Sequence, residues 1–501
     1  MGEKMLSNEQ LRHIIDVGNA LTAEKNKRKL LAFILQSAME LSRCDAGTLY
    51  LYRDDKLHFM IMKTLSQQVS RGEDGEPIDM PPVEMKEDNV CSYTAIHKQM
   101  VNIADVYHSE KFDFSGPRKY DAITGYHTQS MLVVPMENTQ GELIGVLQLI
   151  NAQDAQGQVI PFDAEAEFVI RSLGSQAAVA VTNQLYMEEI KQQMYSFVEA
   201  FATTIDARTP YNGSHTRMVT IYARLLAEYM NRLHEMGKCE IHFDENRMEQ
   251  LQLAAALHDI GKMVIPLSVM NKESRLGELG LEKIKDRFAL LDAYYELDAL
   301  KGRISREQSE ERRQHLKDNL ACIEKINKAG FLPDDMLAKV SDMGACSYEK
   351  EDGSRIPYLT EEERICLSIR KGTLTQEERE IMEEHVVMTG RILDKVHFNS
   401  QYKNVAGFAA SHHELLDGSG YPKKLSGEEL PLEARMLAVV DVFDALTCTD
   451  RPYKVPMPKE KALSILQSMA QEGKLERRLV TWLEEALEAV EMEELRKQSM
   501  F

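Results

Sequence analysis

The stretch SHHELLDGSGYP, residues Ser411–Pro422, decides how the second half of this chain is interpreted. It places two histidines side by side, follows them with a glutamate, and ends in a turn-forming segment with two glycines and a proline. A helix cap before a surface loop would explain the glycines and the proline, but it would not explain His412 next to His413. Imidazole and carboxylate side chains are ligands of iron, manganese, zinc and nickel, so the stretch favours a metal site over a plain helix end.

Three other stretches place histidine or aspartate where a metal site could use them. LHDIGK, Leu257–Lys262, ends a helical run with a His-Asp pair, and such neighbours can reach one metal or bridge two. Asp441 lies in a strongly apolar helical stretch, where a lone carboxylate is costly unless paired or metal-bound, and Asp444 follows one turn later on the same face. A helix that opens with a capping box carries His385. An isolated His-Asp pair is a weak signal, but the ordered set is much stronger.

Length and composition restrict the class of protein. The chain has 501 residues and a mass of 57.1 kDa, which predicts two or three domains. Its longest apolar stretch is about as long as Leu143–Ile150, which is too short for a transmembrane helix of about 20 residues. The N-terminus lacks the build of a signal peptide. Seven cysteines without a close CxxC pair fit reduced thiols of the cytoplasm.

The net charge of −20 excludes a basic nucleic-acid surface. An acidic chain can still bind phosphate esters if bound metal, or a few placed lysines and arginines, supply the positive charge. A metal site would therefore also supply the positive charge that this acidic chain needs to bind a negatively charged phosphate ester.

The hydrophobic pattern changes along the chain. The first 185 residues alternate strand-like runs with helical spacing, which predicts an α/β domain. Helical spacing then continues without proline or glycine to Phe201, which predicts one long connecting helix. This helix is either a spacer or, when paired in a dimer, a coiled coil. From Tyr195 onward the composition predicts an all-helical domain.

The motifs of the second half together resemble the HD-GYP family of cyclic-dinucleotide phosphodiesterases. HDIGK, HHELLDGSGYP and DVFDALTCTDRPYK match the family pattern almost residue for residue, and the resemblance covers about 195–268 and 370–490. It implies an all-helical HD-superfamily fold and hydrolysis of cyclic di-GMP.

The resemblance also implies a centre of two divalent metals, with iron or manganese as the expected ions. One metal would be held by His215, His258 and Asp441, the other by His385, His412 and His413, with Asp259 as the bridge. Asp259 and Lys262 would be catalytic. The residues expected beside the substrate are Lys262, Gly420, Tyr421, Pro422, Asp444, Arg451 and Lys454.

Two features depart from the family pattern. His258 and His385 are 127 residues apart in the sequence, so residues of about 269–370 are interpreted as an insertion. We expect a helical excursion on the surface, because an insertion in a loop costs little; it could be a lid, a dimer element, a partner site or a passive decoration. Some family members have a glutamate four residues before the first histidine, where it serves a third metal. Tyr211 occupies that place here, which favours two metals.

The N-terminal half is similar to a GAF domain over about 20–185. The stretches Lys119–Thr128 and Gly141–Asn151 resemble the GAF domains of cyclic-nucleotide phosphodiesterases and cyclases. The resemblance implies a cyclic nucleotide or another small ligand, or else a module that only packs or dimerises. Asp121, Thr124 and Thr128 are the candidate ligand contacts.

These observations lead to one leading hypothesis. The protein is expected to be a bacterial, cytoplasmic, homodimeric signal-transduction enzyme that hydrolyses cyclic di-GMP to linear pGpG, GMP or both, under control of its GAF domain. The alternatives are a phosphodiesterase for another cyclic dinucleotide or nucleotide, and an inactive cyclic-dinucleotide-binding scaffold. The expected parts are a GAF domain at 20–185, a connecting helix at 186–205 and an HD-GYP domain at 195–490 with its insertion at about 269–370.

Overall fold

The computed structural model divides into two compact units, Met1–Gln193 and Met194–Phe501. It describes residues 16–21, 24, 26–73, 78–208, 214–448, 457–490, 492–495 and 497–501. Arg451, Lys454 and Tyr211, which the sequence singled out, lie outside the described residues.

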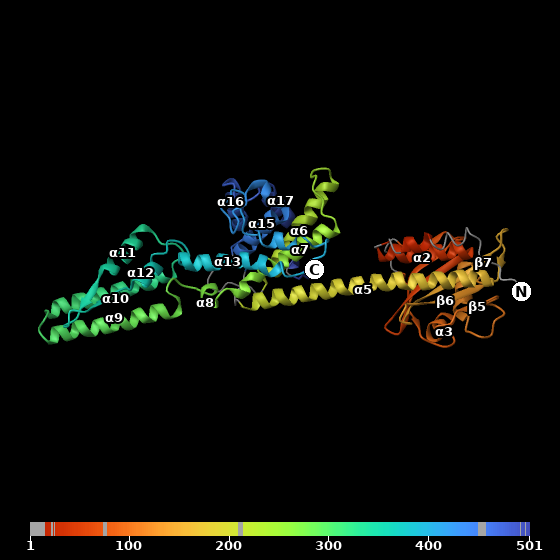
Figure 1. The fold of residues 1–501 in the computed structure, drawn as a ribbon, viewed down its shortest axis with the longest axis horizontal. Helices are drawn as coiled ribbons and strands as arrows, with labels where there is room; N and C mark the ends of the chain where they lie inside the picture. Colours follow the sequence, from red (N-terminus) through yellow and green to blue (C-terminus); the bar gives the residue numbers. More distant parts are fainter. Residues whose placement is uncertain are drawn as a thin grey trace. The chain divides into compact units, whose positions relative to one another are not determined.

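The first unit is built on an antiparallel sheet of eight strands in the order β3-β2-β1-β7-β6-β5, with β4 on β2 and β8 on β7 (Figure 1). The strands are β1 Cys44–Arg53, β2 Lys56–Thr64, β3 Val69–Arg71, β4 Val83–Glu84, β5 Val101–Ile103, β6 Met131–Glu137, β7 Leu143–Gln153 and β8 Val159–Ile160. The helices are α2 Lys27–Ser42, α3 Val90–His97, α4 Ser115–Thr124 and the start of α5, Ala164–Arg208.

Alternation along the strands gives this sheet two apolar faces. In β1, Leu49 and Leu51 pack into a cluster with α2 and α5, whereas Tyr50 between them packs on the opposite side with α3. Both faces are therefore covered, as the α/β pattern of the sequence predicted.

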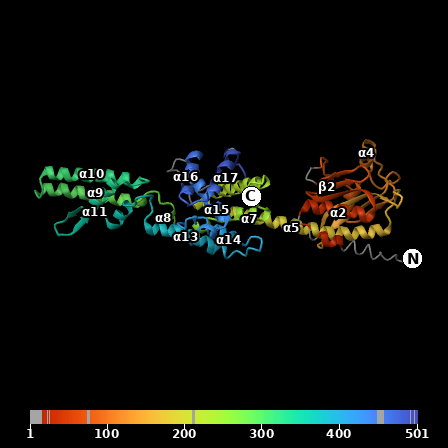
Figure 2. The same ribbon diagram turned by 90° about the horizontal axis from the view of Figure 1, so that it is seen from above.

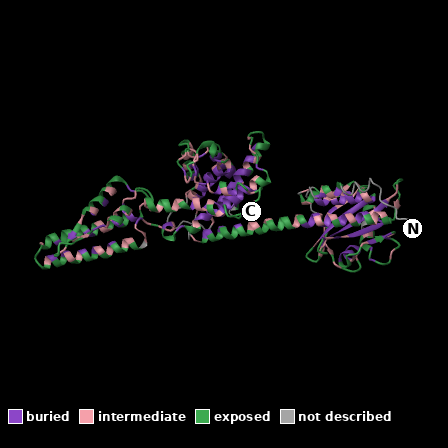
Figure 3. Ribbon diagram, viewed as in Figure 1, coloured by how far each residue is buried: buried purple, intermediate pink, exposed green. Residues whose placement is uncertain are grey.

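The residues expected to form a connecting helix, 186–205, lie within the longer helix α5, which runs for 45 residues from Ala164 to Arg208. Asn183–Lys191 includes several exposed positions, and Figure 3 shows a long exposed stretch in this helix. Its last turns belong to the second unit, where Ala202 and Ile205 are buried in the main helical core.

The second unit is largely helical. Its main core joins the end of α5 to α6 His215–Glu235, α7 Glu245–Leu257, α13 Gln376–Leu393, α14 Val405–Ala409, α15 Leu432–Thr447, α16 Lys459–Gln471, α17 Arg477–Glu488 and α18 Met492–Leu495. Figure 2 shows α15, α16 and α17 gathered together. Two short 3-10 turns, η1 Ile260–Val264 and η2 Gly427–Glu429, and the one-turn helix α8 Leu267–Met270 connect these elements. No helix among the described residues is long and apolar enough to span a membrane.

The segment between α8 and α13 has a hydrophobic core of its own. It contains α9 Gly277–Leu300, α10 Arg306–Lys328, α11 Asp334–Ala345 and α12 Glu361–Leu367. A hairpin of β9 Ser347–Glu349 and β10 Arg355–Pro357 also lies here, so the segment is not purely helical as the composition predicted. Its two ends meet, because the ammonium group of Lys272 lies 2.7 Å from a carboxylate oxygen of Glu378.

Candidate metal centre

Five short segments of the second unit bring the predicted ligands together. His215 opens α6, His258 caps the end of α7, and Asp259 directly precedes η1. His385 lies in α13, Asp441 lies in α15, and His412 and His413 follow α14. His215, His258, His385 and His412 are each 1 to 4% exposed.

The side chains of His215, His258 and Asp259 form one group, which Asp441 completes. Nε2 of His258 lies 3.2 Å from Oδ2 of Asp259, and Nε2 of His215 lies 3.5 Å from the same oxygen. Asp441 closes the group, because its Oδ1 lies 3.3 Å from Nε2 of His215. The ligand atoms of His215, His258 and Asp259 all lie within 4.8 Å of one another.

The second group is made by His385, His412 and His413, whose ligand atoms also lie within 4.8 Å of one another. Oδ1 of Asp259 faces this group, at 3.5 Å from Nε2 of His385 and 3.9 Å from Nε2 of His412. Asp259 therefore directs one oxygen to each group, which is the arrangement of a bridging carboxylate.

Three of the histidine rings are held in place by a hydrogen bond at Nδ1, the nitrogen that faces away from the centre. Nδ1 of His258, His385 and His412 donates to the carbonyl oxygen three residues earlier, at 2.6 to 2.7 Å. Such bonds fix the tautomer and aim Nε2 at the centre. The Nε2 atoms of these three rings and Oδ1 of Asp259 are buried and lack a hydrogen-bond partner among the described residues. Buried polar atoms are rarely left unpaired, so the donor set fits a metal.

The charges also suit metal binding. Burial lowers the pKa of His385 to about 4 and that of His412 well below its usual value, so both rings are neutral and can donate a lone pair. Burial acts in the opposite direction on Asp259, but the neighbouring His258 and Lys262 outweigh it and hold the pKa of the carboxyl well below its usual value. Neutral imidazole and ionised carboxylate are the forms that bind metals.

Lys262 lies against the bridging aspartate. Its Nζ is 2.6 Å from Oδ2 of Asp259, and its side chain is 19% exposed. An ammonium group at this place can meet a negatively charged ligand that enters the centre; the catalytic and substrate-binding role of Lys262 stays a prediction.

The predicted pocket wall folds tightly over His413. The Tyr421 ring centroid lies 4.9 Å from that of His413. Gly420 has no room for a side chain, because a Cβ there would lie 2.5 Å from Cα of Glu414 and from the carbonyl oxygen of His413. Glu414 carried no predicted role, yet its carboxylate accepts from the backbone N–H groups of Lys423 at 2.6 Å and Leu425 at 3.0 Å. A carboxylate directly after two candidate metal-binding histidines was the available signal.

Asp444 has a different place from the one predicted. We expected it beside the substrate, but it is 2% exposed and its Oδ2 lies 2.7 Å from Nδ1 of His215. It lies behind a ligand, where it orients the ring as the backbone carbonyls orient the other histidines.

Thr389 joins the segments that the insertion separates in the sequence. Its hydroxyl donates to the carbonyl oxygen of His258 at 2.9 Å and accepts from the N–H of Gly261 at 3.0 Å. A Cβ on Gly261 would collide with the carbonyl oxygen of His385 in the same helix. Close backbone contact thus sets the distance between the two groups of ligands.

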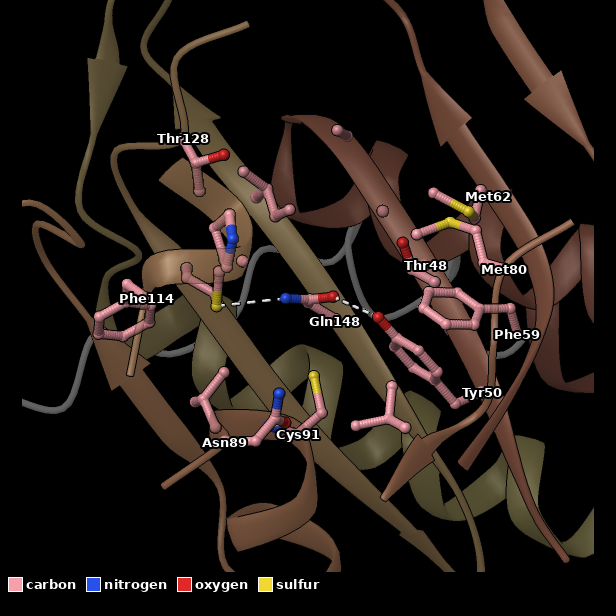
Figure 4. Close-up of a pocket in the computed structure, with 18 of the residues that line it drawn as sticks. Thr48, Tyr50, Phe59, Met62, Met80, Asn89, Cys91, Phe114, Thr128 and Gln148 are labelled. Carbon is pink, nitrogen blue, oxygen red and sulfur yellow. Dashed lines mark hydrogen bonds between the residues drawn. The ribbon is translucent and has the colours of Figure 1, made fainter. Parts of the chain in front are cut away.

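A cavity of about 290 Å³ lies in the first unit between the sheet and α3 (Figure 4). Most of its lining is apolar, and its floor carries a bond of 2.9 Å from the Tyr50 hydroxyl to Oε1 of Gln148. Of the three predicted ligand contacts, only Thr128 lines this cavity among the described residues. Asp121 instead accepts from the N–H and the hydroxyl of Thr128, each at 2.8 Å, and so serves the loop rather than the cavity.

Comparisons with known proteins agree with this architecture. The model of the GAF domain family matches residues 27–181, and two models of the HD domain match 212–326 and 362–479. A 3'3'-cGAMP-specific phosphodiesterase of Vibrio cholerae is 40% identical over 98 residues, which are 20% of each chain. A cyclic di-GMP phosphodiesterase of Thermotoga maritima is 43% identical over 108 residues, 21% of this chain and 28% of the relative. The matches therefore span well under a third of the length of these two relatives. The chain joins a GAF domain to an HD domain that carries the HD-GYP motifs.

Proposed function

We propose that this protein is a metal-dependent phosphodiesterase that hydrolyses cyclic di-GMP. The observation that carries the proposal is Asp259, which directs one carboxylate oxygen to each of two histidine groups. A pair of metals is a recurrent device for displacement at phosphorus, and relatives of the HD domain are named as phosphodiesterases of cyclic dinucleotides.

Two metal ions per chain fit the donor set. One would be held by His215, His258 and Asp441, the other by His385, His412 and His413, with Asp259 shared. Five imidazoles with two carboxylates favour iron or manganese. When bound, such a pair supplies an activated water and positive charge for the phosphate oxygens.

The chain's own residues orient the substrate and balance its charge. Lys262 is poised to meet the scissile phosphate, since its ammonium group is already held beside Asp259 at 2.6 Å. Tyr421 and Pro422 would limit how the dinucleotide ring lies over His413. In-line attack would release linear pGpG, and a second round would release GMP.

Two alternatives remain as outcomes of the experiment. Another cyclic dinucleotide could be the preferred substrate, because both cyclic di-GMP and 3'3'-cGAMP appear in the names of relatives. An inactive scaffold is disfavoured, because the seven predicted ligands converge and six of them are buried.

The test is hydrolysis by protein purified without oxygen, with metal content determined on the same sample. We expect turnover of cyclic di-GMP with about two metals per chain, and loss of both turnover and one metal in Asp259→Asn. Asp394→Asn, at the exposed end of α13, is the matched control. Full turnover in Asp259→Asn with metal still bound would refute the mechanism, and faster turnover of 3'3'-cGAMP would change the substrate.

The GAF cavity is proposed to hold a small regulatory ligand. Lys63 and Asp113 are the only charged side chains among the described residues that line it, which favours an uncharged ligand over a cyclic nucleotide with its phosphate. Calorimetric titration of the full chain with cAMP and cGMP tests this choice. Binding that is lost in Gln148→Leu would restore the cyclic-nucleotide interpretation.

The predicted homodimer is proposed to form along the exposed part of α5. Met187, Ile190, Phe197 and Phe201 are 62, 60, 67 and 49% exposed, and together with Met194 they repeat at the alternating intervals of three and four residues that coiled coils use. Sedimentation should show a dimer that Ile190→Glu converts to monomer, with Glu189→Gln as the control on the same helix. A monomeric wild-type chain would leave α5 as a spacer.

A further inference from the structure

The last turn of α5 makes polar contacts with two of the segments that supply metal ligands. The carboxylate of Asp206 is 7% exposed and accepts from the hydroxyl of Thr216 at 2.8 Å. Thr216 is fully buried and directly follows His215 at the start of α6. The end of the connecting helix therefore holds the segment that carries the first ligand.

Arg208 makes the second contact, two residues later. Its guanidinium group donates to the carbonyl oxygens of Lys262 at 3.2 Å, of Met263, and of Ile265 at 3.3 Å. These carbonyls belong to the end of η1 and the residue after it, and that of Lys262 also accepts from the N–H of Ile265 at 3.2 Å. η1 directly follows Asp259 and contains Lys262, so Arg208 holds the segment that carries the bridging ligand and its cation.

We infer that Asp206 and Arg208 are positioning residues that set the distance between the His215 segment and the Asp259–Lys262 segment. The inference rests on the proposed function, since it assigns these residues to the geometry of the same centre. A guanidinium fork is rigid and binds several acceptors at once, and displacements of about 1 Å in a catalytic constellation can cost about a hundredfold in rate. The helix that leaves the GAF domain thus ends on the parts of the HD domain whose spacing matters most.

A purely structural role would be to dock α5 onto the helical core. Apolar contacts already do this, because Val198, Ala202 and Ile205 are buried in that core. The polar contacts do something the apolar ones do not. They hold backbone and side-chain atoms that lie next to the candidate ligands, so they fix where those segments lie relative to α5.

The experiment compares Arg208→Gln with Arg208→Lys, and Asp206→Ala with Asp206→Asn, in the full chain. Arg208→Lys keeps a cationic donor at this position. Asp206→Asn keeps an oxygen that can accept from Thr216. In each pair, the conservative variant is therefore expected to restore part of the function that the other variant loses. Thr203→Ala is the matched control, because the Thr203 hydroxyl is exposed and donates only to the carbonyl oxygen of Glu199 within α5. Mn²⁺ serves as the probe metal.

We expect Arg208→Gln and Asp206→Ala to weaken Mn²⁺ binding by about tenfold or more, as loss of support behind metal ligands does, and to lower kcat with KM within about threefold. The electron paramagnetic resonance signal of the coupled Mn²⁺ pair should change in both variants. Arg208→Lys and Asp206→Asn should recover part of each loss, and Thr203→Ala should match the wild-type chain.

Wild-type Mn²⁺ affinity, spectrum and kcat in both Arg208→Gln and Asp206→Ala would overturn the inference. A lower melting temperature of the metal-free variants with an unchanged spectrum in the folded fraction would also overturn it, because that outcome describes a structural role only. If the wild-type chain hydrolyses no cyclic dinucleotide, the proposed function fails, while Mn²⁺ affinity and the spectrum still decide the positioning role.

Discussion

Nδ1 of His215 lies 2.7 Å from Oδ2 of Asp444, although 229 residues separate the two in the sequence. Both side chains are nearly fully buried. Among the histidines of the centre, His215 thus has a carboxylate behind it where His258, His385 and His412 have backbone carbonyls. A carboxylate behind a ligating imidazole raises the basicity of the ring as well as fixing its tautomer.

The first prediction concerns this pair. Asp444→Ala should weaken metal binding by about 10- to 100-fold, because the ring of His215 loses both its orientation and its charge partner. Titration of the metal-free chain with Mn²⁺ measures the effect, with Asp394→Ala as the exposed control. Equal affinity in Asp444→Ala and wild type would show that the backbone alone positions His215.

The second prediction concerns the close approach of η1 to α13. In Gly261→Ala the new Cβ would collide with the carbonyl oxygen of His385 and lie 2.6 Å from the backbone nitrogen of Thr389. Overpacking of this kind costs about 1–3 kcal/mol of the free energy of unfolding, and it should also lower metal occupancy by moving the two ligand groups apart. Gly407→Ala is the control, since its Cβ would meet nothing within 4 Å. Unaltered thermal stability and occupancy in Gly261→Ala would contradict the prediction.

The third prediction concerns the loop that forms the pocket wall. Glu414→Gln replaces one acceptor oxygen by a donor that faces a backbone N–H, so one of the two bonds to Lys423 and Leu425 is lost. An unpaired buried group costs about 1–3 kcal/mol, and the loosened wall should raise KM for cyclic di-GMP more than it lowers kcat. Steady-state kinetics measure this split, with Glu428→Gln in η2 as the exposed control. A fall in kcat at constant KM would assign Glu414 to the metal centre instead.

The fourth prediction concerns pH and the metal-free chain. Burial lowers the pKa of His385 to about 4 and that of His412 well below its usual value. As the pH falls below the ordinary pKa of about 6.5, the unfolded state binds more protons than the folded state, so stability falls with pH; for His385 this continues down to about pH 4.

His215 acts in the opposite direction. Burial disfavours its charged form, but hydrogen bonds to three carboxylates outweigh burial and raise its pKa well above the usual value. Its contribution is therefore complete below about pH 6.5 and is lost as pH rises through the folded-state pKa. The melting temperature of the HD domain in a chelator should peak near pH 6.5. A melting temperature that rises steadily down to pH 4 would contradict the lowered pKa values of His385 and His412. One that does not fall as the pH rises above 6.5 would contradict the raised pKa of His215.

The convergence of the candidate ligands was predictable from the sequence, because metal chemistry accepts few residue types and the motifs keep them in a fixed order. The sheet and the long helix were predictable because apolar periodicity changes from two to about 3.6 residues. The direction in which a given side chain points could not be predicted from the sequence. Asp441 and Asp444 share one helix face, and only the packing of α6 against α15 decides that the first faces the centre and the second lies behind His215.

Contacts outside the motifs were also beyond prediction. Asp206 and Arg208 lie in a helix whose pattern indicates only helical structure, and their partners are up to 57 residues away in the sequence. Asp121 was predicted to contact a ligand, but the backbone N–H and hydroxyl of Thr128 occupy its carboxylate. The short hairpin at 347–357 rests on a few residues with no strong alternation, so it was hidden within a helical composition.

The insertion has a consequence for the time at which the centre can form. His258 and Asp441 contribute to the same group of ligands but are 183 residues apart in the sequence. At a synthesis rate of about 5–20 residues per second, the ribosome needs roughly 9 to 37 seconds to make the chain between them. During that interval the segment at 269–370 can fold on its own core. His215, His258 and Asp259 have then been made, but the candidate ligands that follow the insertion are not yet all present. Complete loading with metal can therefore begin only after the segment that carries Asp441 has been made.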